Sequence, residues 1–368
     1  MKNSFGNALN ITIFGESHGK SVGLVLDGLP AGIPINTEYI NKCLDLRKPK
    51  KDIGTSRKEA DELFIESGVK NGFSTGSSIL LRIENKDVRG SDYSQFEDIP
   101  RPGHTDYVSS VKYNGFADLN GGGHFSGRLT APIAALGGII LPALKRKGIL
   151  IGSHILSIKA VKESKFSENT NTLKEQIENL EDKAFAVINS SAKEKMENEI
   201  KKAKENGNSV GGIIETAVLG MPRGAGEPWF DSIESTVSHA LFSVPAVKGI
   251  QFGKGFDFAN ILGSEANDCF TLNSQNEVVT ATNNNGGING GISNGMPIVF
   301  SVVLKPTPTI SYPQKTLNLK TKKEETLICK GRHDPSIVPR ANIVIKSLTA
   351  FCIADILTLK YGTDWMAL

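Results

Sequence analysis

Histidines in loops framed by glycine and proline are the first candidates for chemistry in this sequence of 368 residues. His18 lies in the polar turn of residues 15–19, and His104 follows a Pro-Gly pair, with Asp106 two residues further on. Because an imidazole titrates near neutral pH, a histidine held in such a loop can deliver or accept a proton. A nearby carboxylate can fix which ring nitrogen carries that proton. A purely structural histidine in a turn remains the alternative at both positions.

Groups that bind anions recur in three further loops. Three consecutive glycines at 121–123 precede an apolar helical pattern, so free backbone N–H groups there would face an anion. Residues 305–309 read Lys-Pro-Thr-Pro-Thr and offer an ammonium and hydroxyl groups. Residues 331–335 bring a cation, an imidazole and a carboxylate together, and Pro335 keeps Asp334 out of helical geometry. The sequence therefore predicts an enzyme that binds phosphorylated, carboxylate-rich ligands and moves protons.

The glycine-rich loops also allow other interpretations. Residues 15–21 approach the pattern of a nucleotide-binding P-loop, but the spacing between the glycines is one residue too short, which argues against an NTPase. A non-catalytic nucleotide or RNA binder would carry basic runs interleaved with aromatic residues, and the sequence has none. A simple glycine hinge remains the alternative for residues 121–123.

Composition and charge exclude several classes of protein. Lys and Arg number 42 against 39 Asp and Glu, and a net charge of +3 is too small for a dedicated nucleic-acid or membrane-surface binder. No apolar run approaches the roughly 18 residues of a membrane span, and no signal peptide is evident. The four scattered cysteines form no Cys-x-x-Cys pair, so we expect reduced thiols, no metal site and a cytoplasmic protein.

Short β-branched runs bounded by glycine predict the strands that hold these loops. They fall at residues 11–14, 22–26, 78–83, 212–218, 246–252 and 297–304. Two helices, predicted over about 129–147 and 341–361, are apolar on most faces, so we expect them to be covered by sheets. No repeat or linker divides the chain, and we therefore expect residues 1–368 to form a single domain.

The stretch 161–206 differs from the rest of the chain, because 19 of its 46 residues are charged. Capping-box patterns begin at Thr172 and Ser191, and apolar residues recur at helical spacing after each of them. We expect two solvated surface helices here, with a partner-binding arm as the alternative.

Five segments together resemble the chorismate synthase family, in the order and at the spacing found there and over essentially the whole chain. They are residues 15–19, 101–106, 283–291, 305–307 and 331–335. The resemblance implies a carbon–oxygen lyase of the shikimate pathway that converts 5-enolpyruvylshikimate-3-phosphate to chorismate and phosphate with reduced FMN (FMNH2). It also implies an α+β fold, a β–α–β sandwich with helices packed between two antiparallel sheets, and a homotetramer. A flavin reductase or other FMN oxidoreductase on the same scaffold remains the alternative.

The same resemblance implies three catalytic residues. His18 would protonate the leaving phosphate as general acid, a task suited to an imidazole near neutral pH. His104 would protonate or polarise the reduced flavin ring. Asp334 would act with the flavin N5 atom in removing the proton from C6 of the substrate.

Arginine is scarce, with 10 among the 42 basic residues, and the resemblance assigns several arginines to ligands. Arg47 and Arg101 match substrate-clamping positions, Arg47 also matches an NADPH contact, and Arg57 is the candidate for a further arginine. NADPH is the candidate reductant for the flavin. The FMN contacts that carry over are His124, Phe125, Ser126, Pro245, Ala246, Gly290, Lys305, Pro306, Thr307, Pro308, Thr309 and Arg332.

The chain departs from the family pattern at three places. His124 and Phe125 stand where the family has an arginine and a serine. Leu46 replaces an arginine, and Asn284 stands where a histidine is common. None of these departures removes a predicted catalytic residue.

Overall fold

The computed structural model describes residues 2–50, 52–55, 61–86, 96–329, 331 and 333–367. Within these ranges, ten strands form two antiparallel sheets of five strands each. The first sheet contains, in spatial order, β1 (Ser4–Phe5), β2 (Asn10–Gly15), β3 (Ser21–Asp27), β7 (Ile79–Glu84) and β4 (Leu63–Ile65). The second contains β11 (Val247–Phe252), β16 (Ile298–Leu304), β10 (Gly212–Leu219), β8 (Leu150–Ile158) and β9 (Val161–Lys162).

Short ribbons and helices complete the described part of the fold. The two-stranded ribbons are β5 (Val69–Lys70) with β6 (Phe73–Ser74), β12 (Phe270–Leu272) with β13 (Val278–Thr280), β14 (Ile288–Asn289) with β15 (Ile292–Ser293), and β17 (Gln314–Leu317) with β18 (Glu324–Leu327). The helices are α1 (Thr37–Arg47), α2 (Asp106–Lys112), α3 (Thr130–Arg146), α4 (Thr170–Leu180), α5 (Ser190–Glu205), α6 (Ile233–Phe242), α7 (Gly263–Ala266) and α8 (Val338–Tyr361).

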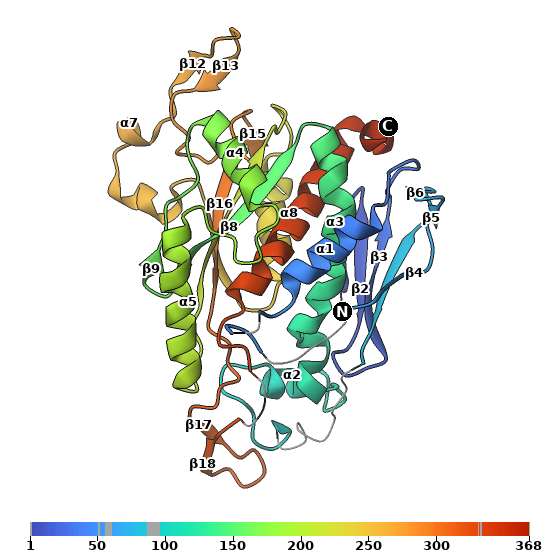
Figure 1. Cartoon of the computed structure of the whole chain (residues 1–368), viewed down its shortest axis with the longest axis vertical. Helices are drawn as coiled ribbons and strands as arrows, with labels where there is room; N and C mark the ends of the chain where they lie inside the picture. Colours follow the sequence, from blue (N-terminus) through green and yellow to red (C-terminus); the bar gives the residue numbers. More distant parts are fainter. Residues whose placement is uncertain are drawn as a thin grey trace.

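The long apolar helices pack against each other and against the sheets. α3 contacts β3 and β7 of the first sheet, α8 contacts β8 and β10 of the second, and the two helices lie side by side (Figure 1). Nearly every residue of both helices is buried, which explains why neither sequence has a polar face. The predicted α+β class with antiparallel sheets is confirmed.

Two neighbouring glycines let three helices approach one another closely. A Cβ atom at Gly137 would lie 1.9 Å from the Oγ atom of Ser347 on α8. A Cβ atom at Gly138 would lie 2.5 Å from the Cα atom of Ile40 on α1. Because these distances are far below van der Waals contact, α3 needs glycine at both positions to pack against α8 and α1.

The sequence pattern located the main elements well. The six predicted strands are β2, β3, β7, β10, β11 and β16, and every predicted boundary lies within one residue of the observed one. The two predicted apolar helices are α3 and α8, although α8 begins three residues earlier than expected. The sequence analysis missed β8, because Gly152, Ser153 and His154 interrupt its apolar pattern, and it did not identify α1 or α6.

Contrary to the expectation from the sequence, two segments within the described residues are long and apolar enough to cross a membrane by length and composition alone. They are Gly127–Arg146 and α8, and the most apolar window of each is 89% and 94% buried inside the fold. Helices covered to this extent by their own protein are core helices.

A buried carboxylate fixes the N-terminal segment that leads into β2. Asp355, in the last third of α8, accepts hydrogen bonds from the backbone N–H groups of Asn7 (3.0 Å), Ala8 (2.8 Å) and Leu9 (2.8 Å). Because β2 starts at Asn10 and ends at Gly15, this contact helps to position the turn that contains His18.

A buried histidine joins the charged segment to the second sheet. The Nε2 atom of His154 on β8 lies 2.9 Å from Glu215 on β10, and its Nδ1 atom hydrogen-bonds Glu163. Glu163 also accepts the backbone N–H of Asn189, the residue that caps α5. Burial alone would lower the pKa of His154, but the hydrogen bonds that its ring donates to the two carboxylates outweigh this effect and raise that pKa above 6.5.

The cluster of His154, Glu163 and Glu215 should make part of the free energy of unfolding depend on pH. Because the pKa of His154 is raised in the folded state, its contribution is fully present below pH 6.5, the ordinary histidine value, and is lost as the pH rises through the folded value. We expect the difference in unfolding free energy between the wild type and His154→Gln to shrink between pH 6 and pH 9. Urea unfolding across this range measures it.

The matched control is His239→Gln, because His239 is exposed and its ring packs edge-on against the Phe5 ring, with 5.0 Å between the ring centroids. Its unfolding free energy should differ from that of the wild type by an amount that does not change with pH. A constant difference for His154→Gln as well would contradict the account.

Candidate active site

The backbone of the three glycines at 121–123, which we call the glycine floor, is the segment against which the loops carrying His18 and His104 pack. All three have positive φ angles, at 62°, 96° and 52°, a region that favours glycine. The turn of residues 15–19 docks on this segment: the N–H of Ser17 donates to the carbonyl of Gly123 (3.1 Å), and its hydroxyl donates to the carbonyl of Asn120 (2.9 Å). Residues about 100 positions apart in the sequence are therefore fixed to each other.

His18 lies directly over the first of these glycines. A Cβ atom at Gly121 would be 2.0 Å from Cε1 and 2.2 Å from Nδ1 of the imidazole. The Nδ1 atom is 3.0 Å from the Ser17 hydroxyl, whose own proton goes to Asn120, so the imidazole donates through Nδ1 to that hydroxyl. The ring can occupy this position only because residue 121 has no side chain.

His104 lies over the next glycine. A Cβ atom at Gly122 would be 3.5 Å from Cε1 and 3.6 Å from Nε2 of its ring. The structure therefore brings His18 and His104 onto neighbouring residues of one backbone segment, as expected for two residues that serve one site.

Arg101 and Asp106 form a buried ion pair behind His104. The Nε and Nη2 atoms of Arg101 donate to the two carboxylate oxygens of Asp106 at 2.8 and 2.7 Å, and both side chains are almost fully buried. Burial by itself raises the pKa of Asp106, but hydrogen bonds from Arg101 and His104 hold it well below its usual range. Arg101 also donates to Thr309 (3.3 Å), so its guanidinium has partners inside the protein, and its substrate contact stays a prediction.

The loop of residues 305–309 connects the His104 loop to Asp334. The ammonium of Lys305 donates to the carbonyl of Gly103 (2.7 Å), and the hydroxyl of Thr307 donates to the carbonyl of Asp334 (2.7 Å). The backbone N–H of Lys305 donates to the carbonyl of Ala246 (2.9 Å), a residue with a φ of 74°. These bonds give the predicted cofactor loop a fixed place between two predicted catalytic residues.

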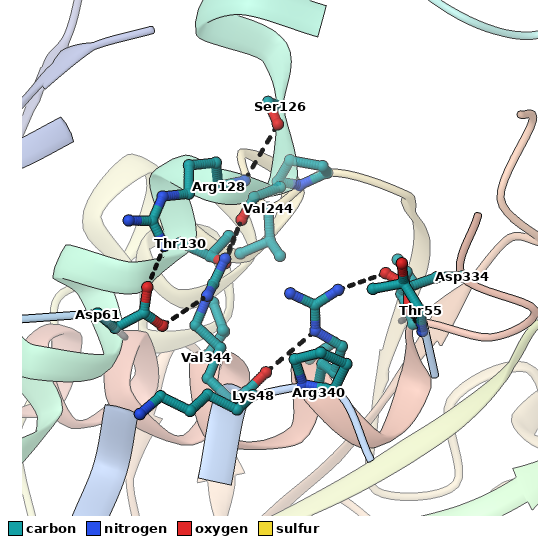
Figure 2. Close-up of a pocket in the computed structure, with 16 residues that line it drawn as sticks. Lys48, Thr55, Asp61, Ser126, Arg128, Thr130, Val244, Asp334, Arg340 and Val344 are labelled. Carbon is teal, nitrogen blue, oxygen red and sulfur yellow. Dashed lines mark hydrogen bonds and ion pairs between the residues drawn. The ribbon is translucent and has the colours of Figure 1, made fainter. Parts of the chain in front are cut away.

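A cavity of about 230 Å³ opens where the C-terminus of α1 meets the N-termini of α3 and α8 (Figure 2). Four of the predicted site residues line it: Arg47, Ser126, Pro245 and Asp334. Neither His18 nor His104 is among the described residues that line it. The predicted catalytic set is thus divided between the glycine floor and this cavity, which are joined by the chain at residues 123–128.

Two carboxylates on opposite sides of the cavity are each held by arginine (Figure 2). Asp61 is buried and forms ion pairs with Arg128 and, at 3.4 Å, with Arg47. Asp334 forms an ion pair with Arg340 and accepts the backbone N–H of residue 55 at 2.9 Å.

The lining therefore carries more positive than negative charge. Three arginines and two carboxylates line the cavity, namely Arg47, Arg128 and Arg340 against Asp61 and Asp334, while the ammonium of Lys48 at its edge is paired with Asp45. A surplus of arginine favours phosphate and carboxylate ligands, because the guanidinium offers paired donors in a fixed geometry.

Sequence reasoning missed Asp61, Thr55 and Arg340 and gave Arg128 no role. The scarcity of arginine was the available signal, since Arg47, Arg128 and Arg340 are three of only 10 arginines in the chain. Arg340 follows Asp334 by six residues, close enough to have been considered with it.

The residues that depart from the family pattern have partners inside the protein. The Nδ1 atom of His124 hydrogen-bonds the carbonyl of Gly15 (2.9 Å), which ties it to the His18 turn. The Phe125 ring lies 6.1 Å from that of Tyr113. The hydroxyl of Ser126 accepts the backbone N–H of Arg128 at 3.2 Å.

The remaining predicted ligand contacts either lie away from the cavity or fall outside the residues that the structure describes. Gly290 belongs to the turn between β14 and β15 and does not line the cavity, and a Cβ atom there would meet nothing within 4 Å. Pro308 lies beside Gly103, with 3.6 Å between its Cβ atom and the place of a Cβ at that glycine. Pro306 approaches Gly211 in the same way at 3.1 Å. Arg57 and Arg332 fall outside the described residues.

The residues present fit the anionic parts of a flavin mononucleotide and of a phosphorylated substrate. A Cβ atom at Gly127 would meet nothing within 4 Å, so the backbone in front of α3 is open to a ligand. The arginines beside it supply the donors that a phosphate group requires.

Comparisons with known proteins agree over nearly the whole chain. The family model described as chorismate synthase matches residues 9–358. The chorismate synthase of Pyrococcus abyssi is 43% identical over 355 residues, which cover 96% of this chain and 97% of that protein. The chorismate synthase of Chitinophaga pinensis is 44% identical over 362 residues, which cover 98% of each.

A solved structure gives the same result in three dimensions. A crystal structure of chorismate synthase superposes with a TM-score of 0.78 at 30% sequence identity and covers 98% of this chain and 95% of its own. A full-length family match, relatives above 40% identity and a shared fold leave one conclusion. The chain belongs to the chorismate synthase family.

Proposed function

We propose that this protein is a chorismate synthase, a carbon–oxygen lyase that eliminates phosphate from 5-enolpyruvylshikimate-3-phosphate. The family match supports this reaction, and the comparisons offer nothing for the flavin reductase alternative. The structural observation that carries the proposal is the placement of His18 and His104 on neighbouring glycines beside an arginine-lined cavity.

The reaction is a 1,4-elimination without net oxidation or reduction. The C3–O bond breaks and phosphate leaves with the bonding electron pair, while a proton is removed from C6 and a new double bond forms. His18 protonates the leaving phosphate oxygen, which stabilises the negative charge that develops there. Its bond to the Ser17 hydroxyl orients the imidazole for this transfer.

Reduced FMN, when bound, lends electron density that eases breakage of the allylic C–O bond. Ser126, Pro245 and the loop of residues 305–309 are the residues that would hold it, with His124, Phe125, Ala246, Gly290 and Arg332 as the remaining predicted contacts. His104 would protonate or polarise the reduced flavin ring. NADPH is the proposed source of the reducing electrons, with Arg47 as its contact.

Asp334 accepts the C6 proton in this proposal. Arg340 and the backbone N–H of residue 55 hold its two oxygens, so the carboxylate is oriented before substrate arrives. Arg47 and Arg101 serve the substrate, with Arg57 as the further arginine, and the positive lining of the cavity gathers its phosphate and carboxylates.

The proposal extends to the whole chain. Residues 1–368 form one domain, ordered as a β–α–β sandwich, which the contacts of α3 with the first sheet and of α8 with the second support. The charged helices α4 and α5 are a solvated surface segment, since each buries only one narrow apolar stripe. The enzyme acts as a homotetramer in the cytoplasm, without nucleic acid or membrane as partner and without a metal.

The test of the function is an anaerobic assay with chemically reduced FMN and 5-enolpyruvylshikimate-3-phosphate, with phosphate and chorismate measured together. We expect the two products in equal amounts. Steady NADPH oxidation without the ester would instead favour a flavin oxidoreductase, and salt-sensitive RNA binding without flavin affinity would favour a nucleic-acid binder.

Substitution of the proposed acid should separate chemistry from folding. We expect His18→Ala to lower kcat by roughly 10²–10⁴-fold, because the leaving phosphate then departs without its proton donor. The anaerobic assay measures kcat, and thermal unfolding checks the fold.

The matched control is His239→Ala on the exposed face of α6, which should keep wild-type turnover. Full activity of a folded His18→Ala enzyme would remove His18 from the mechanism.

A further inference from the structure

We propose that Asp106, paired with Arg101, is a positioning residue that fixes the His104 imidazole with its proton on Nδ1 and its Nε2 atom directed at the site. The inference rests on the proposed function of His104. It goes beyond that function by giving a role to a buried carboxylate that no other part of the proposed mechanism uses.

Both oxygens of the Asp106 carboxylate accept hydrogen bonds. Oδ2 of Asp106 accepts from the Nε atom (2.8 Å) and the backbone N–H (3.0 Å) of Arg101. Oδ1 accepts from Nη2 of Arg101 (2.7 Å) and lies 2.6 Å from Nδ1 of His104. With about 1% of its side chain exposed, Asp106 has no freedom to turn toward another partner.

The donors around this carboxylate decide the proton position on His104. A carboxylate held ionised by a guanidinium can only accept, so the 2.6 Å contact requires a proton on Nδ1. Arg101 also lies 3.1 Å from Nδ1, but a guanidinium has no lone pair to accept from the ring, so the carboxylate is the partner of the Nδ1 proton. With its Nδ1 proton fixed in this way, the ring gains and releases its second proton at Nε2, the nitrogen that faces the site.

The edge of the His104 ring that carries Nε2 faces the glycine floor. The Nε2 atom is the ring nitrogen nearer to Gly122, 3.6 Å from the place where a Cβ atom would stand. The side chain is 16% exposed, against 1% for Asp106 and 3% for Arg101, so the imidazole is the most accessible of the three groups. Asp106, whose two oxygens face Arg101 and His104, can therefore act at the site only through the imidazole.

The arginine makes this arrangement stable. A lone carboxylate at such a buried position would be costly to ionise, and the bidentate guanidinium offsets that cost. The Arg101 guanidinium also stacks on the Phe96 ring at 4.4 Å, and its Nη1 atom donates to Thr309. These contacts explain why Arg101 is buried although the resemblance assigns it to substrate.

The first test reads the tautomer without any substrate. In Asp106→Asn the single amide oxygen must serve Arg101, which turns the NH2 group toward His104 and makes Nδ1 an acceptor. We expect ¹⁵N NMR of labelled histidine, with the His104 ring in its neutral form, to show the proton on Nδ1 in the wild type and on Nε2 in the variant. An unchanged Nδ1–H signal in the variant would overturn the proposal.

The second test uses kinetics in a double-mutant cycle. Asp106→Asn should lower kcat by roughly 10²–10⁴-fold and change KM by less than about threefold, as expected when a carboxylate sets the tautomer of a catalytic histidine. In a His104→Ala background the same substitution should cost nothing further, because the residue acts only through that imidazole. An equal loss in both backgrounds would mean a merely structural role and would overturn it.

Two further variants keep these tests decisive. Asp98→Asn removes an exposed carboxylate paired with Lys320 and should leave the tautomer and kcat unchanged. If Asp106→Asn does not fold, Arg101→Met combined with Asp106→Leu removes the paired charges together with the acceptor of the Nδ1 proton, and the Nε2–H form should then dominate. A retained Nδ1–H signal in the folded double variant would contradict the proposal, whether or not the protein turns over the phosphorylated ester.

Discussion

The His18 imidazole occupies the space that a side chain at residue 121 would need. The site depends on this absence of a side chain at residue 121, because the ring can lie against the backbone only where glycine leaves room. The path of the backbone also requires glycine, since all three residues at 121–123 have positive φ angles. The next glycine carries the ring of His104, whose proton is placed by Asp106. Two proposed proton carriers from distant parts of the sequence thus lie against neighbouring residues of one backbone segment.

In the cavity beside this floor, by contrast, each of the two carboxylates that line it forms an ion pair with arginine. Asp61 lies between Arg47 and Arg128, and Asp334 is paired with Arg340. The elements that supply these groups are the ends of α1, α3 and α8, which converge because α3 packs closely on both other helices at its paired glycines. The packing of the apolar core therefore determines where the charged groups of the cavity meet.

Periodicity and motif spacing sufficed to predict what depends on neighbours in sequence. The apolar runs of β3 and β16 identified them as strands, and the loops with His18 and His104 were recognised by their framing glycines. What stayed out of reach depends on tertiary contact: nothing near Asp61 in sequence indicates that it will hold two arginines from α1 and the start of α3. The same holds for β8, whose His154 is polar in sequence and buried between two glutamates in the fold.

The most direct test of the shared floor is the turnover of Gly121→Ala against Gly115→Ala. Both positions have positive φ angles, at 62° and 80°, so backbone strain is similar, but a Cβ atom at Gly115 meets nothing within 4 Å. The added methyl group at residue 121 must displace the His18 ring, and kcat in the anaerobic assay should fall by roughly 10²-fold or more while Gly115→Ala stays near the wild type. Equal turnover of the two folded variants would contradict the account.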